Sequence, residues 1–183
     1  MSLMAAFLKF KLYWKIFIMQ KSNIILIGMP GVGKSTVGVL LAKSLLASFC
    51  DTDLIIQREC KKSLCEIIAE SGVASFVETE TRIVAAQSFE NCVVATGGSV
   101  VYGEDAMRNL CKNGTVVYLQ VTAEELEKRI CNIKTRGIAM KDGTSIAELF
   151  AERAPLYEKY ADITVDCTLL TPEECVDAIV AKL

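Results

Sequence analysis

One octapeptide near the amino terminus constrains the fold of this chain more than any other feature. Residues 28–35 read GMPGVGKS and match the pattern G-x-x-x-x-G-K-[ST] at every position. An apolar run typical of a buried strand precedes the pattern, and apolar residues at helical spacing follow it. Glycines let backbone N–H groups turn toward an anion, and a helix N-terminus favours negative charge. The octapeptide therefore predicts a P-loop that binds nucleotide phosphates.

The residues expected to bind the nucleotide follow from this pattern. They are Gly31, Val32, Gly33, Lys34, Ser35 and Thr36. The Lys34 ammonium suits the β- and γ-phosphates, and the Ser35 hydroxyl suits Mg²⁺. We therefore expect a nucleoside triphosphate and Mg²⁺ to bind here.

A P-loop alone is shared by GTPases, ATPase motors and small kinases. The chain has no N-K-x-D pattern, which a GTPase needs to recognise guanine. Neither of its Val-rich apolar runs, residues 92–98 and 115–121, ends in the Asp-Glu pair typical of a motor. Both observations favour a small kinase that transfers the γ-phosphoryl group to a bound metabolite.

The rest of the chain alternates between strand-like and helix-like segments. Strand-like runs occur at residues 23–28, 49–53, 92–98, 115–121 and 162–166. Helical patterns occur at residues 34–47, 54–60, 63–88, 122–130, 145–161 and 171–183. We expect a break at Ser71-Gly72, a kink or break at Pro155, and N-caps at Thr122 and Thr171. Five strands alternating with helices predict an α/β fold, a parallel sheet with helices on both faces.

Composition narrows the class of partner and the compartment. The 183 residues are 52% hydrophobic, and the net charge of −2 leaves no broad basic face for nucleic acid, so we expect a small-molecule partner. The eight cysteines form no C-x-x-C pair and there is no histidine, which excludes a Cys₂His₂ zinc site and a Cys–His dyad. Cysteines scattered through apolar segments are typical of reduced thiols, so we expect a cytoplasmic protein.

Residues 1–22 are predicted to be an extension that precedes a single domain at residues 23–183. The apolar stretch MAAFLKFKLYWKIFIMQK contains lysines too often to span a bilayer, and no small-residue cleavage site follows it. Met1-Ser2-Leu3 is typical of a cloning remnant, and Met19 is a candidate natural start. The extension could bind a membrane surface, form a dimer, or pack on the domain. We expect a monomer, with a dimer through the extension as the alternative.

Several motifs, taken in their order and spacing, resemble those of the shikimate kinase family. They are the P-loop, Asp51-Thr52-Asp53, ATGG at 95–98, RAPLYEKYAD at 153–162 and VDCTLLTPEE at 165–174. The resemblance covers about residues 23–183. It implies the architecture of nucleoside monophosphate kinases, with acceptor-binding helices at about 54–90 and a closing lid at about 131–145. It also implies transfer of the γ-phosphoryl group of ATP to the 3-hydroxyl of shikimate, with Mg²⁺.

The resemblance implies roles for two carboxylates and two glycines. Asp51 would hold the Mg²⁺ shell together with Ser35. Asp53 would accept a hydrogen bond from the reacting hydroxyl and take its proton, and Gly97 and Gly98 would bind the acceptor. Positioning and charge compensation matter more than a strong base in phosphoryl transfer, so a carboxylate suffices. The alternative for both aspartates is an N-cap pair for the following helix.

The resemblance also implies roles for three arginines. Arg136 would reach the transferring phosphoryl group from the lid, with a solvated loop arginine as the alternative. Arg153 would bind the carboxylate of the acceptor, because a planar guanidinium suits a carboxylate. Its alternative is a surface ion pair with Glu148 or Glu152. Arg129 would lie beside the adenine.

Four positions depart from the family pattern. One is Val73, which follows Gly72 where the family has a glutamate. Val77 stands where the motif Phe-Arg-x-x-Glu has a second carboxylate-binding arginine, while Glu80 at the end of that motif is present. Ser99 replaces the third glycine of a run that would approach the ligand closely, and Gly137 replaces the proline after the lid arginine. A charge-assisted hydrogen bond contributes about 1.5–3 kcal/mol, so the loss at position 77 predicts weaker binding of a carboxylate.

These departures leave three hypotheses open. The first is a kinase for shikimate, and the second is a kinase for another hydroxylated metabolite, which Val77 favours. The third is a nucleotide-binding module without phosphoryl transfer. The presence of Lys34, Asp53 and Arg136 argues against the third hypothesis.

Overall fold

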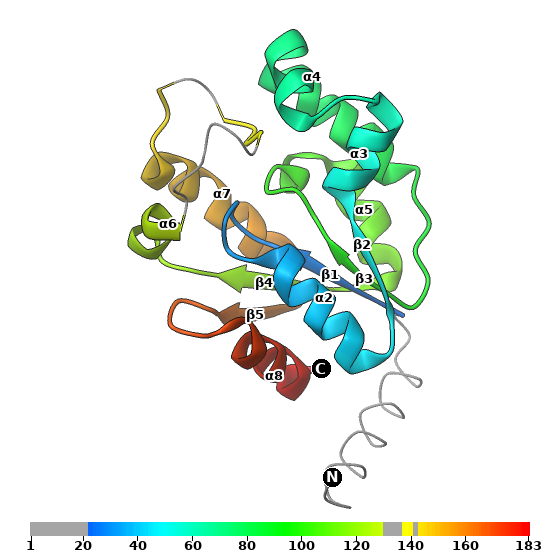
Figure 1. Ribbon diagram of the computed structural model, residues 1–183, viewed down its shortest axis with the longest axis vertical. Coiled ribbons are helices and arrows are strands. Elements are labelled where there is room, and N and C mark those ends of the chain that lie inside the picture. Colours follow the sequence, from blue (N-terminus) through cyan, green and yellow to red (C-terminus); the bar gives the residue numbers. More distant parts are fainter. Residues whose placement is uncertain (1–21, 130–136, 141–142) are drawn as a thin grey trace, which may run out of the picture.

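The computed structural model describes residues 22–129, 137–140 and 143–183 (Figure 1). Its centre is a single parallel sheet with the strand order β2-β3-β1-β4-β5. The strands are β1 (Asn23–Ile27), β2 (Ser48–Asp51), β3 (Cys92–Ala95), β4 (Gly114–Gln120) and β5 (Ile163–Asp166). The predicted five-stranded parallel sheet is confirmed.

Helices cover both faces of this sheet (Figure 1). On one face lie α2 (Lys34–Leu45) and α8 (Pro172–Lys182), and on the other lie α5 (Glu104–Asn113) and α7 (Ile146–Tyr160). The helices α3 (Thr52–Cys60) and α4 (Leu64–Ala85) pack together above the sheet, with the short 3₁₀ helix η1 (Val100–Tyr102) against α4. The helix α6 (Ala123–Arg129) packs on α7.

The central strand β1 is buried along its whole length, which explains its nearly continuous apolar sequence. Its one polar residue, Asn23, uses both ends of its side-chain amide. The Nδ2 group donates to the carbonyl oxygen of Phe89, and Oδ1 accepts from the N–H of Cys92. These bonds join β1 to the start of β3 and satisfy a polar group that would otherwise be costly to bury.

Two expectations about helix breaks have different outcomes. Within α4, Gly72 has φ +78 and ψ 167, so the predicted break is confirmed. At Pro155 the prediction was a kink or a break, and the break is wrong, because α7 runs uninterrupted from Ile146 to Tyr160. Pro155 and Ala151, whose carbonyl loses its helical partner, are both exposed, so water can satisfy the freed group.

Parts of the earlier expectations fall outside the described residues. The proposed extension lies almost entirely within residues 1–21, and most of the proposed lid, including Arg136, lies within residues 130–136 and 141–142. Among the described residues, no helix is both long enough and apolar enough to cross a membrane. None of the seven described cysteines forms a disulfide.

Candidate active site

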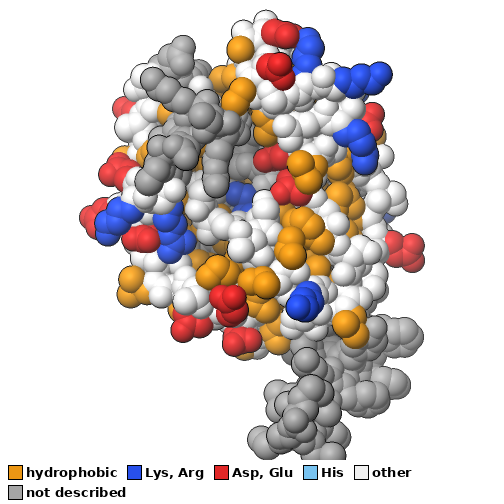
Figure 2. All heavy atoms as spheres, in the orientation of Figure 1, with side chains coloured by type: hydrophobic (Ala, Val, Ile, Leu, Met, Phe, Trp, Pro, Cys, Tyr) orange, Lys and Arg blue, Asp and Glu red, His pale blue; other side chains and the backbone are white. Residues whose placement is uncertain are grey.

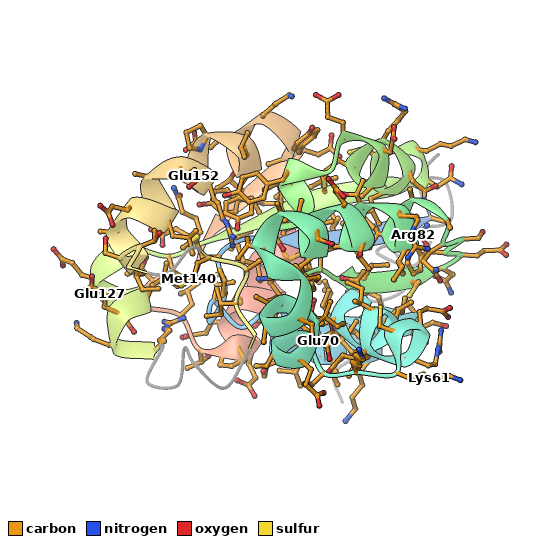
Figure 3. All side chains as sticks on the ribbon, turned by 90° about the horizontal axis from the view of Figure 1, so that it is seen from above. Lys61, Glu70, Arg82, Glu127, Met140 and Glu152 are labelled. Atoms are coloured by element: carbon orange, nitrogen blue, oxygen red, sulfur yellow. The ribbon has the colours of Figure 1, made fainter. Side chains whose placement is uncertain are left out.

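A cavity of about 520 Å³ opens where the carboxyl ends of the strands meet. Ligands of open α/β sheets bind at this edge, and the cavity collects segments that follow β1, β2 and β3. Seen from above in Figure 3, Met140 and Glu152 lie on the side of α6 and α7, and Lys61 and Glu70 lie on the side of α3 and α4. Because the cavity collects these segments, it brings the predicted nucleotide and acceptor residues into one space.

The P-loop leaves the N-terminus of α2 open toward this cavity. Gly33, the residue before α2, has φ +104 and supplies no side-chain cap, so the first N–H groups of the helix can serve an anion. Gly28 has φ +141, and a Cβ there would lie 2.5 Å from the carbonyl oxygen of Leu119. Only glycine fits such a turn, which places the loop against the end of β4.

The side chain of Lys34 is folded back onto this loop. Its Nζ atom donates to the carbonyl oxygens of Gly28 at 2.7 Å and Met29 at 2.9 Å. Burial lowers the pKa of Lys34 to about 8, although the nearby carboxylate of Asp53 opposes that change. A bound phosphate would attract this buried cation more strongly than two carbonyl groups do.

Ser35 and Asp51 bring two hard oxygen ligands together. The Ser35 hydroxyl donates to Oδ2 of Asp51 at 2.6 Å, and Oδ1 of Asp51 accepts from the backbone N–H of Asp53 at 3.0 Å. The N-cap alternative therefore holds for Asp51 but not for Asp53. Among the described residues there is no cluster of three metal-binding side chains. The pair still fits Mg²⁺, which takes few protein ligands and completes its shell with water and phosphate oxygens.

Asp53 extends from the first turn of α3 into the cavity. Its Oδ1 atom is buried and has no hydrogen-bond partner among the described residues. Burial raises the pKa of Asp53 to about 6, Asp51 raises it further, and the Lys34 cation opposes both effects. A carboxylate with an unused acceptor and a raised pKa is poised to take a hydrogen bond from a ligand hydroxyl.

Gly97 and Gly98 lie between the carboxylates of Asp53 and Glu80 and the guanidinium of Arg153. A Cβ on Gly97 would overlap Oε1 of Glu80 and would lie 2.8 Å from Oδ1 of Asp53. A Cβ on Gly98 would lie 3.1 Å from Nη1 of Arg153. A side chain at position 97 would displace the ends of two carboxyl side chains, and one at position 98 would also press on Pro30, whose Cδ lies 2.8 Å from the Cβ position.

Two residues that the sequence did not identify hold this glycine pair in place. The N–H of Gly97 donates to Oγ1 of Thr52 at 3.2 Å, and the Tyr157 hydroxyl donates to the carbonyl oxygen of Gly98 at 2.7 Å. Thr52 is the middle residue of Asp51-Thr52-Asp53, and Tyr157 belongs to the RAPLYEKYAD segment. Their place within these two motifs was the only signal in the sequence that they belong to the site.

Arg153 is buried in α7, with 1% of its surface exposed. Its Nε atom donates to the Tyr102 hydroxyl at 3.1 Å, Nη2 donates to the carbonyl oxygen of Ala139, and Nη1 has no partner among the described residues. The alternative of a surface ion pair is wrong, because Glu148 caps α7 and Glu152 accepts instead from the Tyr102 hydroxyl at 2.6 Å. Among the described residues, one buried guanidinium nitrogen, Nη1 with its two N–H groups, is left for a ligand.

Arg129 lies at the other end of the cavity, at the end of α6. Its Nε donates to Glu125 at 3.0 Å, and its Nη2 donates to the carbonyl oxygens of Cys167 and Thr168 at 3.3 and 3.0 Å. The guanidinium therefore joins α6 to the loop that follows β5. Arg129 is the residue that the resemblance to the family places beside the adenine.

Comparison with known proteins identifies the family of this chain. The family model described as "Shikimate kinase" matches residues 30–183. The chain belongs to the shikimate kinase family.

Similar proteins support this assignment in both sequence and structure. The chain is 35% identical to the shikimate kinase of Caldanaerobacter subterraneus over 86% of its own length and 94% of that protein, and 36% identical to that of Trichormus variabilis over 91% of each. Shikimate kinase from Acinetobacter baumannii in complex with shikimate superposes with a TM-score of 0.81 at 26% identity, covering 93% of this chain and 96% of that one. The Aquifex aeolicus enzyme gives 0.73 at 34% identity, covering 87% and 94%.

The structure places Val77 away from the cavity wall. Val77 lines a separate groove between α4 and η1, together with Thr81 and Tyr102. Tyr102 also contacts Arg153, with the guanidinium carbon 5.2 Å from the ring centroid. A tyrosine that holds the remaining arginine thus lies next to the position where the family pattern has another arginine. Sequence analysis did not identify Tyr102, since no motif marks it.

Ser99 and Gly137, two further departures from the family pattern, each have a local explanation. Ser99 has φ −90, a conformation open to any residue, and its hydroxyl donates to Oε2 of the buried Glu80 at 2.5 Å. Gly137 has φ +62, and a Cβ there would lie 2.7 Å from Cβ of Leu64 and 2.8 Å from the backbone nitrogen of Cys65. Proline has φ near −65° and cannot adopt this conformation. Gly137 therefore lets the chain pack closely against the start of α4.

Proposed function

We propose that this chain transfers the γ-phosphoryl group of ATP to the 3-hydroxyl of shikimate. The observation that carries the proposal is one cavity with an open P-loop, a free buried carboxylate oxygen on Asp53, and a free buried N–H on Arg153. These groups match a phosphate donor, a hydroxyl and a carboxylate, respectively. Membership of the shikimate kinase family supports the same donor and acceptor.

The P-loop end of the cavity would bind the nucleotide. The glycine turn and the open end of α2 suit the phosphates, and Lys34 would exchange its two carbonyl partners for phosphate oxygens. Arg129 would lie against the adenine side. Ser35 and Asp51 would hold Mg²⁺, which neutralises phosphate charge when it is bound.

The opposite end would bind the acceptor. Oδ1 of Asp53 would accept a hydrogen bond from the reacting hydroxyl and then take its proton as the phosphoryl group arrives. With a pKa of about 6, Asp53 is mostly ionised at neutral pH and ready for this role. Nη1 of Arg153 would bind the acceptor's carboxylate, and Arg136, which lies outside the described residues, is proposed to reach the γ-phosphate.

A coupled assay that measures ADP formation tests this function. The panel contains shikimate, other hydroxylated acids, and polyols without a carboxylate. We expect turnover with shikimate and Mg·ATP, and its loss in Lys34→Ala with the melting temperature retained. Binding of ATP without turnover of any acceptor would contradict kinase activity.

A kinase for another hydroxylated metabolite is the second candidate. It is favoured because, among the described residues, Nη1 is the only nitrogen of Arg153 without a partner, and Val77 adds no cation. In the same assay, faster turnover of a different acid or of a polyol than of shikimate would support this candidate.

A further inference from the structure

Glu80 places a carboxyl group directly behind the acceptor end of the cavity. It belongs to α4 and is 1% exposed, so it lies beneath the wall rather than on it. Its Oε2 atom accepts a hydrogen bond from the Ser99 hydroxyl at 2.5 Å, and its Oε1 atom has no partner among the described residues. A buried carboxyl group with one unsatisfied oxygen is costly, and its charge acts strongly on its neighbours.

The neighbours of Glu80 are the groups assigned to the acceptor. The Cβ position of Gly97 meets both Oε1 of Glu80 and Oδ1 of Asp53, so two carboxyl groups approach the same point of the chain. The charged groups that act on Glu80 are Asp53 at the start of α3, Arg153 on α7 and Lys34 at the start of α2. Glu80 is therefore coupled by charge to the guanidinium that would bind the acceptor's carboxylate.

The charge of Glu80 changes close to neutral pH. Burial raises the pKa of Glu80 to about 7, while the hydrogen bond from Ser99 opposes that rise. Asp53 raises the pKa further, and Arg153 and Lys34 lower it. Around pH 7 the chain thus exists both with and without a negative charge beneath the acceptor.

We propose that Glu80 is a specificity-determining residue that sets the charge of the acceptor pocket. When ionised, it weakens the attraction of Arg153 for a carboxylate on the acceptor, and when neutral it leaves that attraction intact. The proposal rests on the proposed function, because it requires an acceptor that carries a carboxylate. Val77 makes the effect larger, since position 77 supplies no cation to offset Glu80.

The substitution Glu80→Gln tests the charge with little change of shape. The glutamine oxygen can still accept from Ser99, and its NH₂ group faces Oδ1 of Asp53 near Gly97. Removing one nearby negative charge should lower KM for shikimate roughly 3- to 10-fold at pH 8, with a smaller change in kcat and none in KM for ATP. Glu78→Gln, an exposed glutamate on the same helix, is the matched control and should change neither constant.

The pH profile separates a charge effect from a structural one. In wild type, KM for shikimate should rise between pH 6 and pH 8 as Glu80 ionises, whereas in Glu80→Gln this rise should disappear. Ser99→Ala provides a second variant. It removes the hydrogen bond that favours the anion, so it should raise the pKa of Glu80 and bring KM at pH 8 closer to that of Glu80→Gln.

The outcomes distinguish this inference from the proposed function. If shikimate is turned over and KM is the same in wild type and Glu80→Gln at every pH, the inference is wrong and the proposed function stands. If shikimate is not turned over, its dissociation constant is measured by calorimetry at pH 6 and pH 8. Charge-dependent binding would then support the inference while refuting the proposed function, and absence of binding would refute both.

Discussion

Asp53 meets two requirements that oppose one another. Its free oxygen must be buried next to the acceptor, yet burial disfavours the ionised form that can take a proton. The pKa in the folded chain is about 6, above the ordinary 3.8, so the folded state holds the proton more tightly than the unfolded state. Stability from this group is therefore present below about pH 4 and is lost as the pH rises through 6.

Asp53→Asn should separate stability from activity. At pH 8 the variant should have a higher free energy of unfolding, by about 1–3 kcal/mol, because it no longer buries an ionised carboxylate. The gain should shrink toward pH 4, where wild-type Asp53 is protonated in the folded chain. The rate of phosphoryl transfer should fall by roughly 10²- to 10⁴-fold. Denaturant titrations at both pH values and the coupled assay measure these effects, and an active Asn variant would exclude Asp53 as the proton acceptor.

The pH dependence of wild-type activity should reflect the ionisation of Asp53. The value of kcat/KM should decline below about pH 6, because a protonated Asp53 cannot accept the proton of the acceptor's hydroxyl. A profile that stays flat down to pH 5, with the chain still folded, would contradict the assignment.

Tyr102→Phe should test how Arg153 is held. The phenylalanine ring keeps the contact with the guanidinium but loses the hydroxyl that accepts from Nε. We expect KM for shikimate to rise roughly 3- to 30-fold with a smaller change in kcat, because the carboxylate is distant from the reacting hydroxyl. The control is Tyr160→Phe. Tyr160 lies on α7, the helix of Arg153, and its ring lies beside Lys159. A fall in kcat at constant KM would assign Tyr102 a different role.

Sequence analysis reached only part of this site. Motif residues such as Lys34 and Asp53 do line the cavity, because each motif describes a short local structure, and their roles there stay predictions. The contacts of Thr52, Tyr102 and Glu80 were not predicted, because their partners lie between 19 and 51 positions away in the chain. Such pairs depend on how α3, α4 and α7 pack, which local patterns do not determine.

At the scale of helices and strands, the strands were predicted from short apolar runs, and most helices were predicted from apolar residues at helical spacing. The helix α5 was not predicted. It has only ten residues, is bounded by glycines at 103 and 114, and buries just Ala106, Met107 and Leu110. The helical spacing of these three apolar residues, together with acidic residues in the first turn and a basic residue in the last, was the signal that could have found it.

The segment at residues 137–140 closes one side of the cavity by packing on the start of α4. Gly137→Ala should disturb this contact, because the new Cβ would meet Leu64 and Cys65. We expect faster backbone hydrogen exchange at residues 137–140 and a raised KM for shikimate, since Ala139 contributes the carbonyl that holds Arg153.

Gly143→Ala provides a matched control for this prediction. Gly143 also has a positive φ, +84, but no described atom lies within 4 Å of its Cβ position. Both variants bear the cost of a left-handed alanine, about 1–2 kcal/mol, and only Gly137→Ala adds a steric overlap. Equal exchange rates in the two variants would show that the contact with α4 is not significant.

At the scale of the whole molecule, the site depends on the parallel sheet. The P-loop follows β1, Asp53 follows β2 and the glycine pair follows β3, so segments distant in sequence meet at one edge. On the face shown in Figure 2, basic and acidic side chains are interspersed, which agrees with the expectation of a small-molecule partner. The described cavity residues all lie between residues 30 and 153.

A chain that begins at Met19 should therefore bind Mg·ATP as tightly as the full chain. The reason is that β1 begins at Asn23 and no described cavity residue precedes Pro30. Calorimetry on both chains measures this, with circular dichroism to confirm that the shorter chain folds. A folded chain without ATP binding would show that residues 1–18 contribute to the site.

The hydrogen bond between Ser99 and Glu80 also bears on how this chain diverged from the family pattern. In that pattern, position 77 supplies an arginine one helical turn from the glutamate, and position 99 is glycine. Losing the arginine first would leave the buried carboxylate with only Arg153 and Lys34 as cations and with no hydroxyl donor. Gaining the serine first would give the carboxylate a new donor before the old neighbour disappeared. The order serine, then valine, is thus the easier evolutionary route, and afterwards a return to glycine at position 99 is blocked until an arginine reappears.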